Sequence, residues 1–171
     1  MTKKPITNIH EQEMRAWSKG SKFAAKLARL GSVIGAEKLG AQLHVVPAGK
    51  AAFPRHAHHA NEEMFYVVSG NGAYQAGDEV WPVKAGDIIA APAGNGDTAH
   101  QMRNNSDGDL VYLTISTRND PDVVEYPDSG KFAVGSMVPT EGGILNARIA
   151  YVGRKEATLD YWDGEDIGDD T

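Results

Sequence analysis

Short apolar runs fill the middle of this 171-residue chain, and residues that favour turns separate them at regular intervals. Glycine accounts for 19 of the 171 residues, above the average usage of about 7%. Such a succession of short strands and tight turns is typical of an all-β Greek-key barrel or jelly roll. Strands are expected at residues 41–46, 51–58, 63–69, 73–76, 80–83, 87–91, 99–103 and 110–116.

The rest of the chain predicts extensions to one domain. We expect residues 1–171 to form a single domain, with a barrel core at about 40–117, an N-terminal extension at 1–39 and a C-terminal extension at 118–171. Residues 10–19 predict a short helix, because Met14 and Trp17 would share one helical face. After residue 117 the sequence is loop-like, apart from a strand expected at 143–152 and an acidic tail at 160–170.

Charge and residue usage restrict the function. With 17 Lys and Arg against 23 Asp and Glu, the net charge is −6, which gives no attraction to nucleic acid or anionic lipid. No stretch approaches the roughly 18 apolar residues of a membrane-spanning helix. The absence of cysteine excludes disulfides, thiolate ligands and cysteine nucleophiles. The first ten residues lack the apolar run of a signal peptide, so a cytoplasmic protein without a membrane role is expected.

Metal-ligand side chains are concentrated between residues 55 and 63, in the sequence Arg-His-Ala-His-His-Ala-Asn-Glu-Glu. Side chains alternate faces along a strand that rises about 3.3 Å per residue, so His56 and His58 point the same way and can converge on one ion. Glu63 follows at the head of the next strand, and His100 offers a fourth ligand further along the chain. A solvated polar strand edge, the competing interpretation, does not account for this spacing.

Two motifs around these residues resemble those of the cupin superfamily over residues 49–104. They read His56-x-His58-x4-Glu63-x6-Gly70, then Gly86-x5-Pro92-x-Gly94 and His100-x3-Asn104. The resemblance implies a cupin-type double-stranded β-helix, a jelly-roll barrel, whose metal ligands are His56, His58, Glu63 and His100. Residues 122–131 also look like a segment that follows the barrel in small, mostly uncharacterised bacterial single-domain cupins.

The second motif departs from the usual cupin spacing. Five residues, 95–99, stand before His100 where cupins usually have two, and the first motif has one extra residue between Gly49 and His56. We expect 94–99 to form a flap at the cavity mouth, in which Gly94 and Gly96 supply unusual backbone angles, with His100 still reaching the ion.

Polar residues near the candidate ligands leave alternatives open. Strand parity favours Glu63 over Glu62 as the ligand, and it puts His59 on the opposite face, at the surface. Gln42 and His44 share a strand face that looks either into the barrel cavity or at solvent. A further group, Asp120, Asp122, Glu125 and Asp128, is interpreted as a solvated acidic loop.

Three neutral imidazoles and one carboxylate leave a divalent ion with a net charge of about +1 and suit Fe, Mn, Ni, Co, Cu or Zn. Positions not filled by protein favour anionic oxygen ligands. We therefore expect a protein that binds or converts a small anionic or hydroxylated metabolite, as an oxygenase, isomerase or lyase. The alternative is a non-catalytic small-molecule-binding or metal-sensing module. A general acid or base in the cavity would favour an enzyme, and His44 and Glu62 are the candidates.

The strand edges and apolar outer faces of an isolated barrel need cover. The regions 20–46 and 144–152 both carry apolar residues and lie largely outside the barrel core. We therefore expect a homodimer in which one of these regions packs on, or joins, a sheet of the partner.

Overall fold

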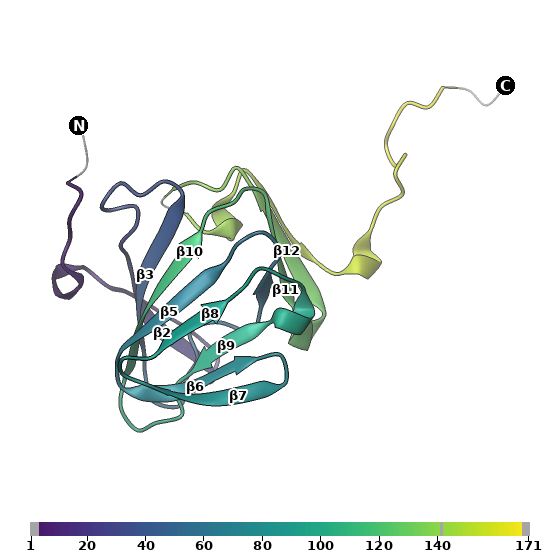
Figure 1. Cartoon of the computed structure of the whole chain (residues 1–171). Coiled ribbons are helices and arrows are strands. Elements are labelled where there is room, and N and C mark those ends of the chain that lie inside the picture. Colours follow the sequence, from purple (N-terminus) through teal and green to yellow (C-terminus); the bar gives the residue numbers. More distant parts are fainter. Residues whose placement is uncertain (1–3, 141, 169–171) are drawn as a thin grey trace.

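The structure is a computed structural model that describes residues 4–140 and 142–168, and antiparallel strands make up most of its regular structure (Figure 1). The strands lie in a six-stranded sheet of order β1-β2-β3-β10-β5-β8, a three-stranded sheet β7-β6-β9 and a four-stranded sheet β13-β12-β11-β4. This arrangement confirms the predicted all-β jelly-roll fold. In the described part of the chain, no helix is long and apolar enough to cross a membrane.

The strands are β1 (Arg15–Lys19), β2 (Phe23–Arg29), β3 (Leu39–Val46), β4 (Ala57–His58), β5 (Glu63–Ser69), β6 (Asn71–Ala76), β7 (Glu79–Lys84), β8 (Ile88–Ala91), β9 (His100–Arg103), β10 (Leu110–Thr117), β11 (Asp122–Tyr126), β12 (Lys131–Ser136) and β13 (Ile149–Gly153). The 3-10 turns are η1 (Ile9–Glu11), η2 (Gly96–Thr98), η3 (Pro127–Ser129), η4 (Ile144–Asn146) and η5 (Lys155–Ala157).

The central strand β10 pairs with β3 on one side and β5 on the other. Its residues alternate between two apolar clusters, as a strand covered on both faces requires. Leu110 and Tyr112 belong to the main core, whereas Val111 and Leu113 pack against a second cluster on the other face. The main core lies between the six-stranded and the three-stranded sheets. Its buried side chains include Val46, Phe65, Val67, Tyr74, Val83 and Met102.

Gly70 takes the chain from the six-stranded sheet to the three-stranded sheet, since β5 ends just before it and β6 begins just after it. Its φ of 81° lies in the left-handed region, where a side chain is disfavoured. A Cβ atom at this position would also collide with the backbone oxygen of Asp109. Glycine is therefore required here for both conformation and space.

The N-terminal extension differs from the prediction, because residues 10–19 do not form a helix. The 3-10 turn η1 comes first, and Arg15–Lys19 then forms β1, which pairs along its length with β2. As part of a strand, Trp17 stacks on Phe53 with ring centroids 5.6 Å apart and packs against the main core. Burial of this indole outweighs the weak helical pattern of a short segment.

The expected strand at 51–58 is also shorter than predicted. Only Ala57–His58 forms a strand, whereas Ala51 and His56 make isolated bridges. Pro54 lies between them and has no backbone N–H with which to continue a ladder.

The C-terminal extension contains two strands, β11 and β12, where the sequence predicted loops. They form a sheet with β4 and with β13, and β13 starts only at Ile149 because η4 occupies the first part of the expected strand at 143–152. Val124 and Ala133 are buried in this sheet. The segment after β13 extends away from the body of the molecule (Figure 1).

Asn104 closes the loop between β9 and β10 from a fully buried position. Its amide group donates hydrogen bonds to the backbone oxygens of Val46 and Gly108, both at 2.7 Å. Its side-chain oxygen accepts from the backbone N–H of Ser106 at 2.9 Å and from the Ser106 hydroxyl at 2.8 Å. One side chain thus satisfies four polar groups.

We predict that Asn104→Ala lowers the free energy of unfolding by about 3 kcal/mol, because it leaves buried backbone groups without partners. The matched control is Asn105→Ala, since the neighbouring Asn105 is exposed and should change stability by less than about 0.5 kcal/mol. Urea unfolding of both variants measures the difference. Equal losses would contradict this account of Asn104.

Candidate metal centre

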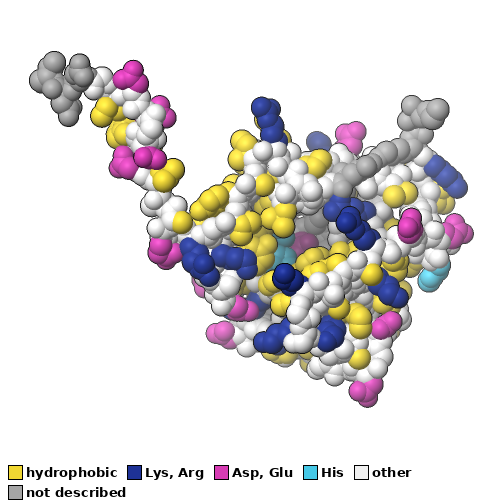
Figure 2. All heavy atoms as spheres, turned by 180° about the vertical axis from the view of Figure 1, so that it is seen from behind, with side chains coloured by type: hydrophobic (Ala, Val, Ile, Leu, Met, Phe, Trp, Pro, Cys, Tyr) yellow, Lys and Arg dark blue, Asp and Glu magenta, His cyan; other side chains and the backbone are white. Residues whose placement is uncertain are grey.

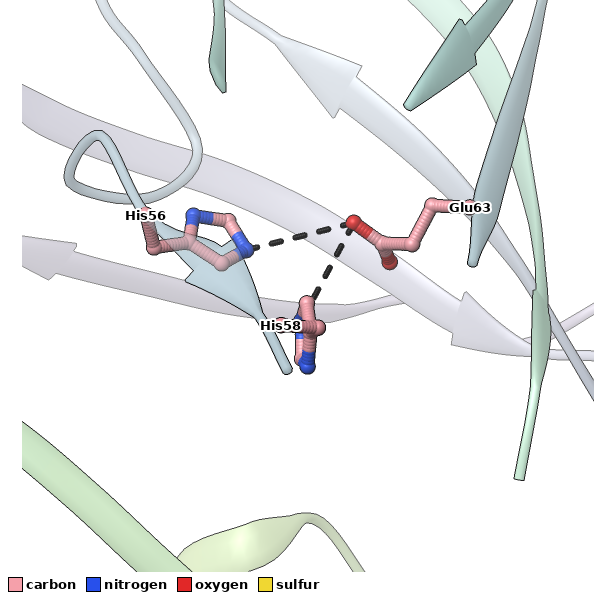
Figure 3. A group of neighbouring side chains, drawn as sticks. All are labelled: His56, His58 and Glu63. Carbon is pink, nitrogen blue, oxygen red and sulfur yellow. Dashed lines mark ion pairs between the residues drawn. The ribbon is translucent and has the colours of Figure 1, made fainter. Parts of the chain in front are cut away.

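The four residues predicted as ligands come together from separate segments. Glu63 is the first residue of β5, His58 ends β4 and His100 begins β9. His56 faces His100 across an antiparallel bridge, with His56 N to His100 O at 3.0 Å and His100 N to His56 O at 2.8 Å. The side chains of His56 and His58 both turn toward the Glu63 carboxylate (Figure 3).

One oxygen of Glu63 lies among the three imidazoles. Its Oε2 atom is 3.0 Å from Nε2 of His100, 3.9 Å from Nε2 of His56 and 4.0 Å from Nε2 of His58. The ligand atoms of His56, His58 and Glu63 all lie within 4.8 Å of one another, a spacing at which these groups can hold one metal ion.

Hydrogen bonds at the far side of two rings fix which nitrogen faces this point. Nδ1 of His56 lies 2.8 Å from the backbone oxygen of Pro54, and Nδ1 of His58 lies 2.6 Å from Oδ2 of Asp122. Both oxygens only accept hydrogen bonds, so Nδ1 carries a proton in each ring. The Nε2 atoms are therefore the ones that can present a lone pair to a metal, and the donor set fits a divalent transition metal.

Burial and charge set the protonation of these groups. Burial lowers the pKa of His56 to about 4, against the opposing charge of Glu63. Burial alone would raise the pKa of Glu63, but the hydrogen bond from His100 and the charges of His58 and His56 lower it to about 2. Burial also opposes protonation of His58, but its bond to Asp122 and the charge of Glu63 give its pKa a net upward shift. Glu63 is thus a carboxylate and His56 a neutral imidazole near pH 7.

The longer turn before His100 does not form a flap at the cavity mouth. Residues 95–99 fold around η2, which contacts β4, and Glu125 Oε2 of β11 accepts from the backbone N–H of Gly96 at 2.9 Å. Residues 94–99 are not among those that line the cavity. Neither Gly94 nor Gly96 has a positive φ, so the predicted reason for these glycines is wrong. A Cβ at Gly94 would collide with the Thr98 side chain, and close approach is the actual requirement. His100 nevertheless lies beside Glu63.

The predicted acidic loop is wrong for two of its members. Asp122 and Glu125 belong to β11, and Asp122 is only 5% exposed while it bonds to His58. Glu125 bonds to Nε2 of His59 at 2.9 Å in addition to Gly96. Asp128 does lie at the surface, paired with Arg55. Sequence reasoning missed the role of Asp122, although the likeness of residues 122–131 to a post-barrel segment pointed to this region.

The candidate centre opens into a cavity of about 460 Å³. Its lining includes all four candidate ligands and Gln42, His44, Tyr112 and Thr114 from β3 and β10. The polar face of β3 therefore looks into the cavity, which decides between the two alternatives for Gln42 and His44. Glu62 is exposed and does not line the cavity, in agreement with Glu63 as the inward residue. Figure 2 shows a hollow with histidine and acidic side chains inside it and Lys and Arg side chains around it.

Comparisons with known proteins agree with the fold. Residues 42–116, which contain all four candidate ligands, match the family model described as the cupin domain. Over these residues, which are 75 of the 171 in the chain, the sequence is similar to the cupin domain, in agreement with the jelly-roll fold. The sequence has no match among curated proteins.

Several solved structures share the fold. One, from Acidithiobacillus ferrooxidans, is provisionally named a sugar phosphate isomerase; it is 24% identical, with a TM-score of 0.74 over 92% of this chain and 96% of its own. A cupin named sugar phosphate isomerase from Silicibacter pomeroyi is 22% identical, with a TM-score of 0.72 over 93% and 98% of the two chains. A predicted oxalate decarboxylase from Thermotoga maritima is 21% identical, with a TM-score of 0.58 over 67% and 99%. The first two similarities extend through most of the terminal extensions.

His44 should make stability depend on pH. Only 4% of it is exposed, and burial lowers its pKa to about 4, against the opposing charge of Glu63. Below pH 6.5 the unfolded chain takes up a proton at this residue that the folded chain does not, so stability falls as the pH drops from 6.5 toward 4. The metal-free protein should lose about 2 kcal/mol between pH 7 and pH 5 from this source.

The variant His44→Gln should remove this part of the loss, as measured by urea unfolding at pH 7 and pH 5. Thr114→Val is the control, because Thr114 lines the same cavity but carries no titratable group. An unchanged pH dependence in His44→Gln would rule out His44 as its source.

Proposed function

We propose that the protein binds a divalent transition metal through His56, His58, Glu63 and His100, and that it binds or converts a small anionic or hydroxylated metabolite there. One observation carries the proposal: the Nε2 atoms of three imidazoles surround one carboxylate oxygen at a wall of a cavity. The donor set suits Fe, Mn, Ni, Co, Cu or Zn without selecting one. When bound, such an ion supplies a Lewis acid with positions left for a ligand.

The cavity lining contains two groups that can bind an anion. Arg29 and Arg118 line the same cavity as the candidate metal ligands, together with the acidic Glu37 and Asp120, so a carboxylate or phosphate group would be bound by the two guanidinium groups and the metal. Arg118 also donates to the backbone oxygen of Pro139 at 3.0 Å, which holds its guanidinium in place. Sugar phosphate and oxalate, named for the similar structures, are both small oxygen-rich anions. These names favour an isomerase or a lyase among the three reaction types.

A non-catalytic binding module is the second candidate. The contacts and the lowered pKa of His44 favour it. Glu62 lies outside the cavity, which leaves His44 as the remaining candidate for proton transfer. Nε2 of His44 lies 3.2 Å from the Gln42 side-chain oxygen, and its ring meets Tyr112 edge-on at 4.6 Å. With a pKa of about 4, this imidazole is a weak base near pH 7. It is better suited to orienting a ligand than to removing its proton.

The double variant His56→Ala with His58→Ala should lose stoichiometric metal binding, because two of the four proposed ligands are removed. The barrel should survive, since its core is built from apolar side chains elsewhere. Elemental analysis of the purified protein measures the metal, and circular dichroism checks the fold. His59→Ala is the control, as His59 turns toward Glu125 instead. A full equivalent of metal in the double variant would refute the site.

Small carboxylates, 2-oxo acids or sugar acids should raise the melting temperature only when metal is present. By linkage, a ligand at a hundredfold excess over its Kd adds about 2.7 kcal/mol of stability. Thermal unfolding of metal-free and metal-loaded protein measures the difference. Equal stabilisation of both forms would show that ligands bypass the metal. Stabilisation without turnover or oxygen uptake by the iron, manganese and nickel forms would select the binding module.

We also propose that residues 1–171 act as one domain in a cytoplasmic homodimer. The edge strand β13 exposes Ile149, Tyr151 and Val152, and the segment after it exposes Tyr161 and Trp162. These apolar surfaces are typical of an interface. Light scattering at micromolar concentration should report twice the chain mass of 18.4 kDa. Replacing Tyr161 and Trp162 by serine should shift the mass toward the monomer, and a monomeric full chain would contradict the proposal.

A further inference from the structure

We infer that Asp122 is a positioning residue of the metal centre, through which the C-terminal sheet holds His58 in its metal-binding orientation. The inference rests on the proposed function, because it concerns how one proposed ligand is held. Asp122 would not contact the ion: its carboxylate lies on the opposite side of the His58 ring from Glu63, bonded to Nδ1.

Both oxygens of the Asp122 carboxylate have partners. Oδ2 accepts the Nδ1 proton of His58 at 2.6 Å, and Oδ1 accepts from the backbone N–H of Ala60 at 3.1 Å. Asp122 is nearly fully buried, so water does not compete for these contacts. A carboxylate held at two points is a rigid acceptor, and a short charge-assisted bond to it restricts rotation of the imidazole.

The backbone fixes Asp122 in register with His58. Strand β11 pairs with β4 so that Val124 lies opposite His58, and the backbone N–H of His59 donates to Val123 at 2.9 Å. Upstream of β11, the Asn61 side chain bonds to the backbone N–H of Asn119 at 2.6 Å and to its oxygen at 3.1 Å. The segment that leads into Asp122 is therefore attached to the chain between His58 and Glu63.

The other two imidazoles have no hydrogen bond to the described part of the extension. Nδ1 of His56 bonds to Pro54, two residues earlier in its own segment, and Nδ1 of His100 has no partner among the described residues. Within the same described residues, His56 meets the extension only through ring stacking on Tyr126, with centroids 6.1 Å apart, so His58 is the one ligand whose ring nitrogen is bonded from outside the matched range of 42–116. Loss of the Asp122 carboxylate should therefore weaken one ligand and leave the others in place.

The test compares Asp122→Ala and Asp122→Asn with the unmodified protein and with Asp128→Asn. Asp128 lies in the same extension but pairs with Arg55 at the surface, so it controls for charge removal. Zn²⁺ affinity is measured by competition with a chelator, and nitrogen couplings are measured in the electron paramagnetic resonance spectrum of the Cu²⁺ form. Melting curves of the metal-free variants separate misfolding from loss of a ligand.

Asp122→Ala should bind Zn²⁺ about 10–100-fold more weakly and lose one nitrogen coupling in the Cu²⁺ spectrum, whereas Asp128→Asn should match the unmodified protein. Asp122→Asn should fall between them, because an amide oxygen can still accept from Nδ1 but its NH₂ group then faces the Ala60 N–H. If Asp122→Ala does not fold, Asp122→Asn decides alone. Unchanged affinity and couplings in the folded Asp122 variants would overturn the inference. Absence of metal binding by the unmodified protein would instead overturn the proposed function.

Discussion

The backbone bridge between His56 and His100 is the contact on which the candidate centre depends. It joins the segment before β4 to the first residue of β9, and so ties the four-stranded sheet to the three-stranded sheet. The two imidazoles then lie with ring centroids 4.9 Å apart beside the carboxylate supplied by β5 of the six-stranded sheet. Each sheet thus contributes to one point, and an error in the register of any of them would separate the ligands.

Glu63 allows this crowded polar cluster to exist inside the barrel. A buried carboxylate is costly unless it is paired, and here His100 donates a hydrogen bond to it while two further imidazoles lie within 4.0 Å. The same carboxylate limits ionisation of nearby phenols: burial raises the pKa values of the Tyr74 and Tyr112 hydroxyls, and the negative charge of Glu63 adds to this effect. Both phenols therefore remain neutral, Tyr74 in the main core and Tyr112 in the cavity lining.

Local patterns were sufficient to predict the barrel but not its extensions. The alternation around Phe65 and Tyr112 and the spacing of the histidines follow from strand geometry, which acts over a few residues. The helix predicted around Trp17 is a strand instead, because the indole stacks on Phe53. A contact with a residue so distant in sequence cannot be predicted from the local pattern. β11 was missed because Asp122 and Glu125 read as solvated charges, and only pairing with β4 and contact with His58 and Gly96 explain their position.

The attachment of the η2 turn to β11 changes what counts as the smallest working module. Residues 42–116 contain every proposed ligand, yet Glu125 holds the turn that precedes His100, and the rest of β11 lies beside His58. A fragment ending after β10 would keep the complete ligand sequence and lose the scaffold on two sides of it. Recombination or gene fusion at the end of the family match would therefore separate a recognisable motif from the parts that give it shape.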